Sequence, residues 1–204
     1  MQQFLDDMDA CPEGREFACA CGSLEKTWEE LCNRHPFGDA PLDLMEEWLP
    51  HLAGYALPPR TVVATFLWAY AQRGRKATDK MPPGLPDPDG SSVKNLLTDL
   101  QRFVDTGELP LTGSSRIRAA RTEYLRVLDH CLPGHAALRA LFYAYDYMFA
   151  WDWRGTASGC CPSYAGALAL VYILDVCSPN THEVFREKMR CTNPFIGDER
   201  KKEI

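Results

Sequence analysis

Two pairs of residues that could bind a metal lie close together near the start of the chain. Cys19 and Cys21 are separated by one residue, and Cys32 and His35 follow them across one predicted helix. Thiolate and imidazole groups are the usual ligands of tetrahedral zinc. Cys32 and His35, three residues apart, are expected on the same face of that helix near its C-terminal end. The pattern predicts a zinc site formed by Cys19, Cys21, Cys32 and His35.

This arrangement is similar to that of SWIM-type zinc modules, whose ligand pairs are C-x-C and C-x-H. The chain departs from the SWIM pattern by one additional residue in the second pair, and the resemblance covers 17 residues, too few to assign a family. In the alternative interpretation, Cys32 packs in the core as a small apolar side chain and the Cys19/Cys21 pair has no role as a ligand. Apart from this zinc ion, the sequence predicts no cofactor.

A second group of chemically suggestive residues precedes Pro162. Cys160 and Cys161 stand directly before this proline, which suits the first turn of a helix. The positive end of the helix dipole stabilises a thiolate, and reactive cysteines are often made in this way. A nucleophile also needs a base, and nothing in the sequence brings a histidine to Cys160. Two interpretations remain open, a cysteine-dependent enzyme using Cys160 or Cys161 and a tight turn between two helices.

Four consecutive residues, Trp151, Asp152, Trp153 and Arg154, form the third group. Tryptophan and arginine are the residue types that dominate the energetics of protein interfaces. The sequence therefore predicts a partner-binding site at these four positions. The alternative interpretation is the end of a core helix whose charged residues face solvent.

The distribution of charge bears on whether the partner is a protein or a nucleic acid. Four arginines gather in one predicted helix, at positions 116, 118, 121 and 126, and such a patch could contact phosphate. The chain as a whole nevertheless has 28 acidic and 22 basic residues, a net charge of −6. Gripping a nucleic-acid backbone depends on dense lysine and arginine, so the balance favours a basic protein partner over nucleic acid. A zinc-stabilised nucleic-acid-associated regulator remains an alternative.

The elements that must position these groups centre on residues 136–177. Two apolar segments, 136–153 and 164–177, are joined by a break containing Gly155, Gly159 and Pro162. The first segment is apolar on nearly every face and lacks the alternation of a strand, which indicates a buried helix. Each segment is shorter than the ~20 residues that a bilayer requires, and each contains aspartate. We therefore expect a helical hairpin at the centre of the core, and no membrane partner.

Helical spacing of apolar residues recurs through most of the remaining chain. It predicts an all-α, single-domain bundle of about eight or nine helices around the hairpin. Residues 1–35 are expected to form a cysteine-rich N-terminal segment, in which a zinc ion could stabilise a small appendage. Residues 36–191 form the helical core with an exposed loop at 74–91, and residues 192–204 form a polar tail.

Some local expectations concern the two ends of the chain. A short helix is predicted around Phe4 to Met8, followed by irregular chain up to Gly22, and Ser23 is predicted to cap the next helix. The last helix is expected to begin after Ser178. Its predicted apolar anchors are Val184, Phe185 and Met189.

The function class follows from these patterns together. The N-terminal residues have neither the basic nor the apolar region of a secretory signal, so a cytoplasmic or other intracellular location is expected. None of the common nucleotide-binding or hydrolase motifs occurs in the sequence. We therefore expect a non-enzymatic protein that binds another macromolecule, most readily a protein, as an adaptor, an antagonist or an immunity-type inhibitor does.

Overall fold

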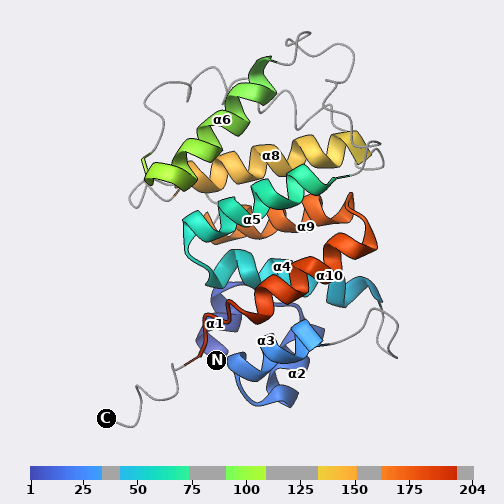
Figure 1. Cartoon of the computed structure of the whole chain (residues 1–204). Helices are drawn as coiled ribbons and strands as arrows, with labels where there is room; N and C mark the ends of the chain where they lie inside the picture. Colours follow the sequence, from blue (N-terminus) through green and yellow to red (C-terminus); the bar gives the residue numbers. More distant parts are fainter. Residues whose placement is uncertain (34–41, 74–90, 109–132, 151–161, 197–204) are drawn as a thin grey trace.

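The computed structural model describes residues 1–33, 42–73, 91–108, 133–150 and 162–196, and helices joined by short turns make up this part of the chain (Figure 1). Nine helices occur in it, without a strand, which confirms the predicted all-α class. Their bounds are α1 Gln2–Asp7, α2 Pro12–Cys21, α3 Leu24–Asn33, α4 Leu42–Ala56, α5 Pro59–Gln72, α6 Ser91–Thr106, α8 Pro133–Ala150, α9 Pro162–Asp175 and α10 Pro179–Arg190.

The predicted central hairpin is present as α8 and α9, which pack against each other. Helix α9 also packs against α4 and α5, so it lies in the interior of the stack of helices in Figure 1. Its side chains Leu170, Ile173 and Leu174 are buried, as is Phe142 of α8. Among the helices that the structure describes, none combines the length and the apolar character that crossing a membrane requires.

Small residues allow α4, α9 and α8 to approach closely. A methyl group added at Gly54 of α4 would collide with the backbone of Gly166 and Ala167 in α9. On the α8 side, a methyl group at Gly166 would lie 2.7 Å from the ring of Tyr147. The backbones of α4 and α9 therefore touch at one point, which larger residues would hold apart. Helix α4 also continues through Pro50.

Helix α6 is an amphipathic helix that packs on α5 and α8. It ends just before Gly107, which adopts φ +77°, a left-handed conformation that glycine tolerates. The Arg60 side chain of α5 donates hydrogen bonds to the last carbonyls of α6, from Nε to Val104 O at 3.0 Å and from Nη2 to Asp105 O at 3.1 Å. An arginine from a neighbouring helix thus satisfies carbonyl groups that would otherwise lack a partner.

The first 22 residues differ from the expectation. Residues 12–21, predicted to be irregular, form α2. Pro12 occupies the first helical position, and Gly22 ends the helix with φ +82°. The ten residues consist largely of alanine, cysteine and charged residues, so they lack the apolar periodicity by which a helix is recognised. Ser23 then caps α3 as predicted, accepting a hydrogen bond from the Lys26 N–H at 3.2 Å.

Helices α1–α3 join the rest of the protein through α4 and α10 (Figure 1). The Trp28 indole of α3 is fully buried and donates a hydrogen bond to Met189 O at 2.8 Å. Phe195, expected in a polar tail, is buried instead and makes edge-to-face contacts with Phe4 and Trp28. The expectation for Val184 was also wrong. Its side chain is exposed, because the buried face of α10 repeats every four residues, at Thr181, Phe185 and Met189.

Candidate functional site

The predicted zinc ligands are only partly within the described residues. Cys19 is exposed and Cys21 is half-buried, both in the last turn of α2, where residues two apart point about 200° away from each other. Cys32 is buried, and burial raises the pKa of its thiol to about 12. In the described part of the chain, no three such side chains gather as metal ligands would. His35 lies outside that part, so the four-residue zinc site remains a prediction.

The other predicted site residues also fall outside the described ranges. They are the partner-binding group Trp151, Asp152, Trp153 and Arg154, the thiols Cys160 and Cys161, and the arginines at 116, 118, 121 and 126. Helix α9 begins at Pro162, as the sequence predicts, so the two thiols precede a helix N-terminus in the chain.

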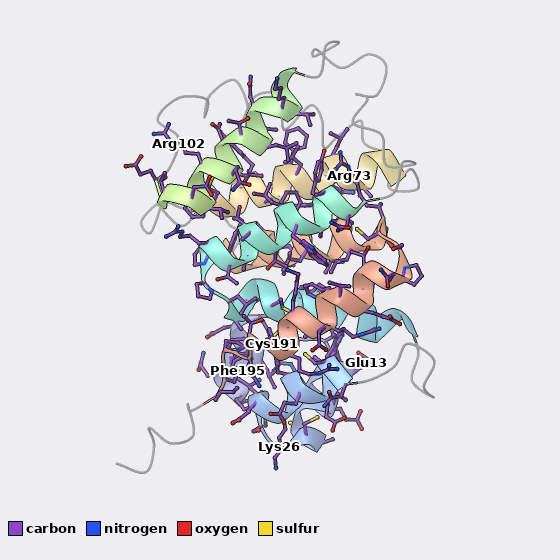
Figure 2. All side chains as sticks on the ribbon, viewed as in Figure 1. Glu13, Lys26, Arg73, Arg102, Cys191 and Phe195 are labelled. Atoms are coloured by element: carbon purple, nitrogen blue, oxygen red, sulfur yellow. The ribbon has the colours of Figure 1, made fainter. Side chains whose placement is uncertain are left out.

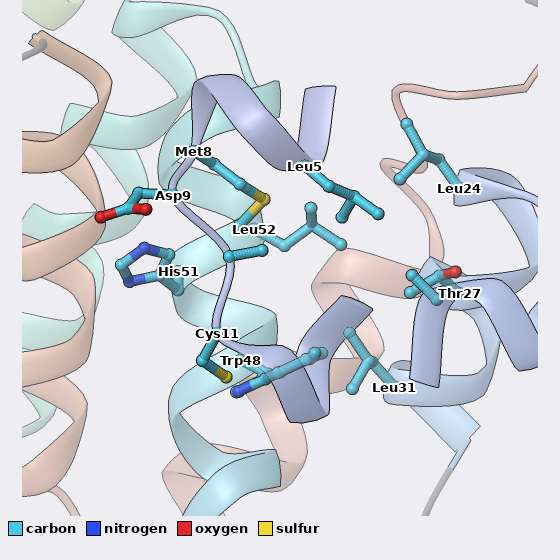
Figure 3. Close-up of a pocket in the computed structure, with 13 residues that line it drawn as sticks. Leu5, Met8, Asp9, Cys11, Leu24, Thr27, Leu31, Trp48, His51 and Leu52 are labelled. Carbon is cyan, nitrogen blue, oxygen red and sulfur yellow. The ribbon is translucent and has the colours of Figure 1, made fainter. Parts of the chain in front are cut away.

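A pocket that the sequence did not suggest lies among α1, α2, α3 and α4 (Figure 3). Its volume is about 210 Å³. Most of its wall is apolar. The large side chains come from α1, the turn after it, α3 and α4, and they are Leu5, Met8, Leu24, Leu31, Trp48 and Leu52, while α2 contributes Gly14 and Ala18. An apolar cavity of roughly 150 Å³ is large enough to hold a benzene ring. This pocket therefore has room for a single large apolar side chain.

The turn between α1 and α2 forms one edge of the pocket. Asp9 adopts φ +49°, and the N–H groups of Ala10 and Asp9 donate hydrogen bonds back to Leu5 O and Asp6 O, each at 3.0 Å. These two bonds are those of a Schellman motif, in which aspartate tolerates the left-handed position better than most residues. The turn is thus a defined structure that places Asp9 beside the pocket.

Arg15 of α2 holds this turn from the outside. Its Nε donates to Ala10 O at 2.8 Å and its Nη2 donates to Leu5 O at 3.1 Å. Its Nη1 pairs with the Asp6 carboxylate, and this hydrogen bond lowers the pKa of Asp6 below its usual value. The Arg15 side chain therefore links α1, the turn and α2 through its hydrogen bonds. Its positive charge is paired with the Asp6 carboxylate.

Small residues of α2 form its side of the pocket. Gly14 and Ala18, four residues apart on one face of α2, both line it. The Trp48 indole of α4 packs so closely on Gly14 that a methyl group there would collide with the ring. Phe17 meets the same indole edge-on, with ring centroids 6.0 Å apart. Trp48 is thereby fixed as part of the pocket wall.

A few polar groups interrupt the apolar wall. In Figure 3, the Asp9 carboxylate and the His51 ring lie on the same side of the pocket, and Leu24, Thr27 and Leu31 lie opposite. The Thr27 hydroxyl donates to Ser23 O at 2.7 Å, so its hydrogen-bonding capacity as a donor is already used. Asp9 and His51 are the other polar side chains with a charge or a ring nitrogen among the lining residues.

His51 is neutral in this setting at ordinary pH. Burial lowers the pKa of its imidazole below the usual 6.5, because an enclosed ring loses the water that stabilises its charged form. The ring stacks on Tyr55 of the same helix, with centroids 5.4 Å apart, and meets Tyr164 of α9 edge-on at 6.1 Å. His51 therefore adds little positive charge to the pocket.

The sequence indicated some of the residues that line this pocket, but it did not indicate that they come together. The apolar stripes of α3 and α4 were recognisable, and both contribute wall residues. The features that form the pocket are Gly14, Ala18 and the turn at Asp9. Gly14 and Ala18 face the pocket only because α2 is a helix, and neither this helix nor the turn was predicted from the sequence.

Compared with known proteins, the chain matches no family model, no curated protein and no solved structure. The pocket and the charge around it are therefore the basis of the functional argument.

Proposed function

We propose that this chain is an intracellular, non-enzymatic binding protein that docks a partner protein by receiving one apolar side chain of it in the α1–α4 pocket. The observation that carries the proposal is the pocket itself, a mostly apolar concavity of about 210 Å³ with Asp9 and His51 on one side. Adaptors, antagonists and immunity-type inhibitors are the classes of binding protein that fit it.

The size of the pocket favours an anchor side chain over a complete small-molecule ligand. Sites for small molecules commonly enclose roughly 300–1,000 Å³. Protein interfaces, in contrast, concentrate their binding energy in a few large side chains that enter well-packed apolar pockets. The wall residues Leu5, Met8, Leu31 and Leu52 are already buried in this chain, so the apolar surface removed from water on docking is mainly that of the entering leucine, phenylalanine or tryptophan side chain. That burial is the main source of free energy available at this site.

The predicted residues Trp151–Arg154 are a second contribution to binding in this proposal. Alanine in place of Trp153 or Arg154 should weaken partner capture by at least ~1 kcal/mol if these side chains are exposed hot spots.

Two matched variants of α2 test the role of the pocket. Ala18 is fully buried and lines the pocket, whereas Ala20, two residues further along the same helix, is exposed. Ala18→Leu would place a larger side chain in the space meant for the anchor, and Ala20→Leu makes the same chemical change on the outer face. Both variants should keep the helical circular dichroism spectrum of the parent.

The measurement is affinity purification from the cells that naturally make the protein, with parent, Ala18→Leu and Ala20→Leu as baits, followed by mass spectrometry. We expect one partner to be recovered with the parent and with Ala20→Leu and to be lost with Ala18→Leu. Recovery of the same proteins with all three folded baits would show that the pocket is not the docking site.

A further inference from the structure

We infer that the segment docking in the α1–α4 pocket is basic, an amphipathic helix that presents one bulky apolar side chain flanked by lysine or arginine. This inference rests on the proposed function and names the chemistry of the partner. It follows from how charge is distributed around the pocket.

The net charge of the chain is concentrated in the residues that build three sides of the pocket. Residues 1–33, which include α1, α2 and α3, contain eight acidic and two basic residues. The rest of the chain contains 20 acidic and 20 basic residues and is neutral overall. The whole net charge of −6 thus belongs to the N-terminal helices. Figure 1 shows these helices together at one end of the molecule.

Asp9 of the pocket and two acidic residues next to lining residues in the chain are exposed to solvent. Asp9 lines the pocket, and the exposed residues Asp7 and Glu13 adjoin the lining residues Met8 and Gly14 in the chain. A partner whose anchor enters the pocket would bring its flanking residues over this turn. Lysine or arginine there would be attracted, and glutamate or aspartate would be repelled.

The two basic residues of this region do little to offset the acids near the pocket. Arg15 is held by Asp6, Ala10 and Leu5, so its charge is paired and its hydrogen-bonding groups are in use. Lys26 is exposed on α3, and Figure 2 places it at the outer end of the molecule. His51 contributes little positive charge, since burial lowers its pKa. Within residues 1–33 the acidic residues thus outnumber the basic ones, and Arg15 is already paired.

Helical form is the natural way to present such an anchor. A helix inserting apolar residues into a groove while its polar face stays in water is a recurrent mode of recognition. Basic residues one turn from the anchor, at the border of the apolar face, would lie over the turn between α1 and α2. An extended basic segment could place its charges over the turn, but only every second side chain would face it.

The probes are three fluorescein-labelled peptides of 16 residues, each designed as an amphipathic helix of leucine and lysine around one tryptophan. The first is the parent peptide, the second has glutamate in place of every lysine, and the third has alanine in place of the tryptophan. Binding to the full chain is measured by fluorescence anisotropy at low salt and again at three times that concentration.

The protein variants separate charge from pocket. The pocket pair is Ala18→Leu and its control Ala20→Leu. The charge variant combines Asp7→Asn, Asp9→Asn and Glu13→Gln, and asparagine at position 9 also tolerates the left-handed conformation. Its control combines Asp99→Asn, Asp105→Asn and Glu108→Gln. These residues lie in or just after α6, at the opposite end of the molecule in Figure 1.

We expect the lysine peptide to bind the parent protein at least about tenfold more tightly than the glutamate or alanine peptide. Ala18→Leu and the charge variant should each weaken its binding about tenfold, the two controls should not, and added salt should weaken it further. Equal binding of the lysine and glutamate peptides overturns the inference, as does no binding of either. The inference is also overturned if the charge variant binds the lysine peptide as tightly as the parent protein does.

The proposed function can fail separately from this inference. Lysine-peptide binding that falls in the charge variant but is unchanged in Ala18→Leu means that the acidic surface attracts the peptide without the pocket, which contradicts both. Binding of a peptide of either charge that is lost only in Ala18→Leu supports the pocket and rejects the basic partner. A third outcome is that no peptide binds, but a natural partner is captured by the parent and not by Ala18→Leu. This result also supports the pocket and rejects the basic partner.

Discussion

Burial decides what individual cysteines of this protein can do. Cys32 lies in the core, and the Cys177 thiol donates weak hydrogen bonds to Ile173 O at 3.2 Å and Ala69 O at 3.4 Å. Burial raises the pKa of Cys32 to about 12 and that of Cys177 to about 11. Both thiols are thus protonated at neutral pH, while Cys11 and Cys19 are exposed.

We expect iodoacetamide at pH 8 to modify Cys32 and Cys177 much more slowly than Cys11 and Cys19, because the thiolate is the nucleophile. Peptide mapping by mass spectrometry measures this. The same experiment tests the cysteine-enzyme alternative. Modification of Cys160 or Cys161 faster than that of Cys11 would favour a reactive site before α9, and ordinary rates at both would argue against it.

The raised pKa of Cys32 also has a consequence for stability. The stability that comes from burying the protonated Cys32 thiol is fully present below the ordinary thiol pKa of 9.0. It is lost as pH rises toward the folded-state value of about 12. Denaturant unfolding at pH 8 and pH 10 should therefore show a loss of stability that is smaller in Cys32→Ala. An identical pH dependence in the two proteins would contradict this.

His51 has the opposite pH dependence. Its folded-state pKa is lowered, so the stability it contributes is present above 6.5 and is lost as pH falls through the folded-state value. Denaturant unfolding between pH 7 and pH 5 should show this loss in the parent and a smaller one in His51→Gln. An NMR titration of the imidazole should give a midpoint below 6.5. A midpoint at or above this value would show that the ring is not enclosed as described.

At the scale of elements, the crossing of α4 and α9 is the most constrained contact. Alanine is ordinarily better than glycine inside a helix by about 1 kcal/mol. At Gly54 the added methyl group would meet the backbone of α9, which cannot move aside as a side chain can. The steric effect should exceed the gain in helix propensity.

We expect Gly54→Ala to destabilise the protein by about 2 kcal/mol, within the usual range for overpacked cores. Gly166→Ala meets the Tyr147 ring, whose adjustment is easier, so its cost should be smaller. Urea unfolding followed by circular dichroism compares the two. An unchanged or higher midpoint for Gly54→Ala would show that the helices do not approach as closely as described.

The sequence predicted helices best where apolar spacing was strong. Helices α3, α8 and α9 each bury several large apolar residues, and their type and approximate ends were recognised. Helix α2 was missed because small residues, Ala18 and Gly14, carry its packing. Phe195 and Val184 were misjudged for a related reason, since burial there depends on which neighbouring helix covers the residue.

At the scale of the whole molecule, one continuous hydrophobic core links the N-terminal helices to the hairpin. It includes Leu5, Ala18 and Trp28 together with Leu170 and Phe185. No periodicity in the sequence could reveal this continuity, because it joins segments more than 150 residues apart, as Trp28 and Met189 are. The pocket is a consequence of the same packing, since it forms where α1–α3 meet α4.

A continuous core implies cooperative unfolding. We expect thermal unfolding monitored by NMR signals of α1–α3 and of α9 to give coincident transitions. Trp28→Phe, which removes the indole hydrogen bond to Met189 O, should lower both midpoints together and cost about 1–3 kcal/mol. Two separated transitions would mean that residues 1–35 form an appendage with its own stability.

The same measurement in the presence of a chelator tests the predicted zinc site. If Cys19, Cys21, Cys32 and His35 bind zinc, metal analysis should return about one zinc per chain, and chelation should lower the midpoint of the α1–α3 signals. Cys21→Ser should then remove the metal and the effect of the chelator. If Trp28, Phe195 and the apolar wall of the pocket suffice to hold these helices, chelator-treated and untreated protein will unfold at one common midpoint, and the Cys32 thiol will remain protonated in both.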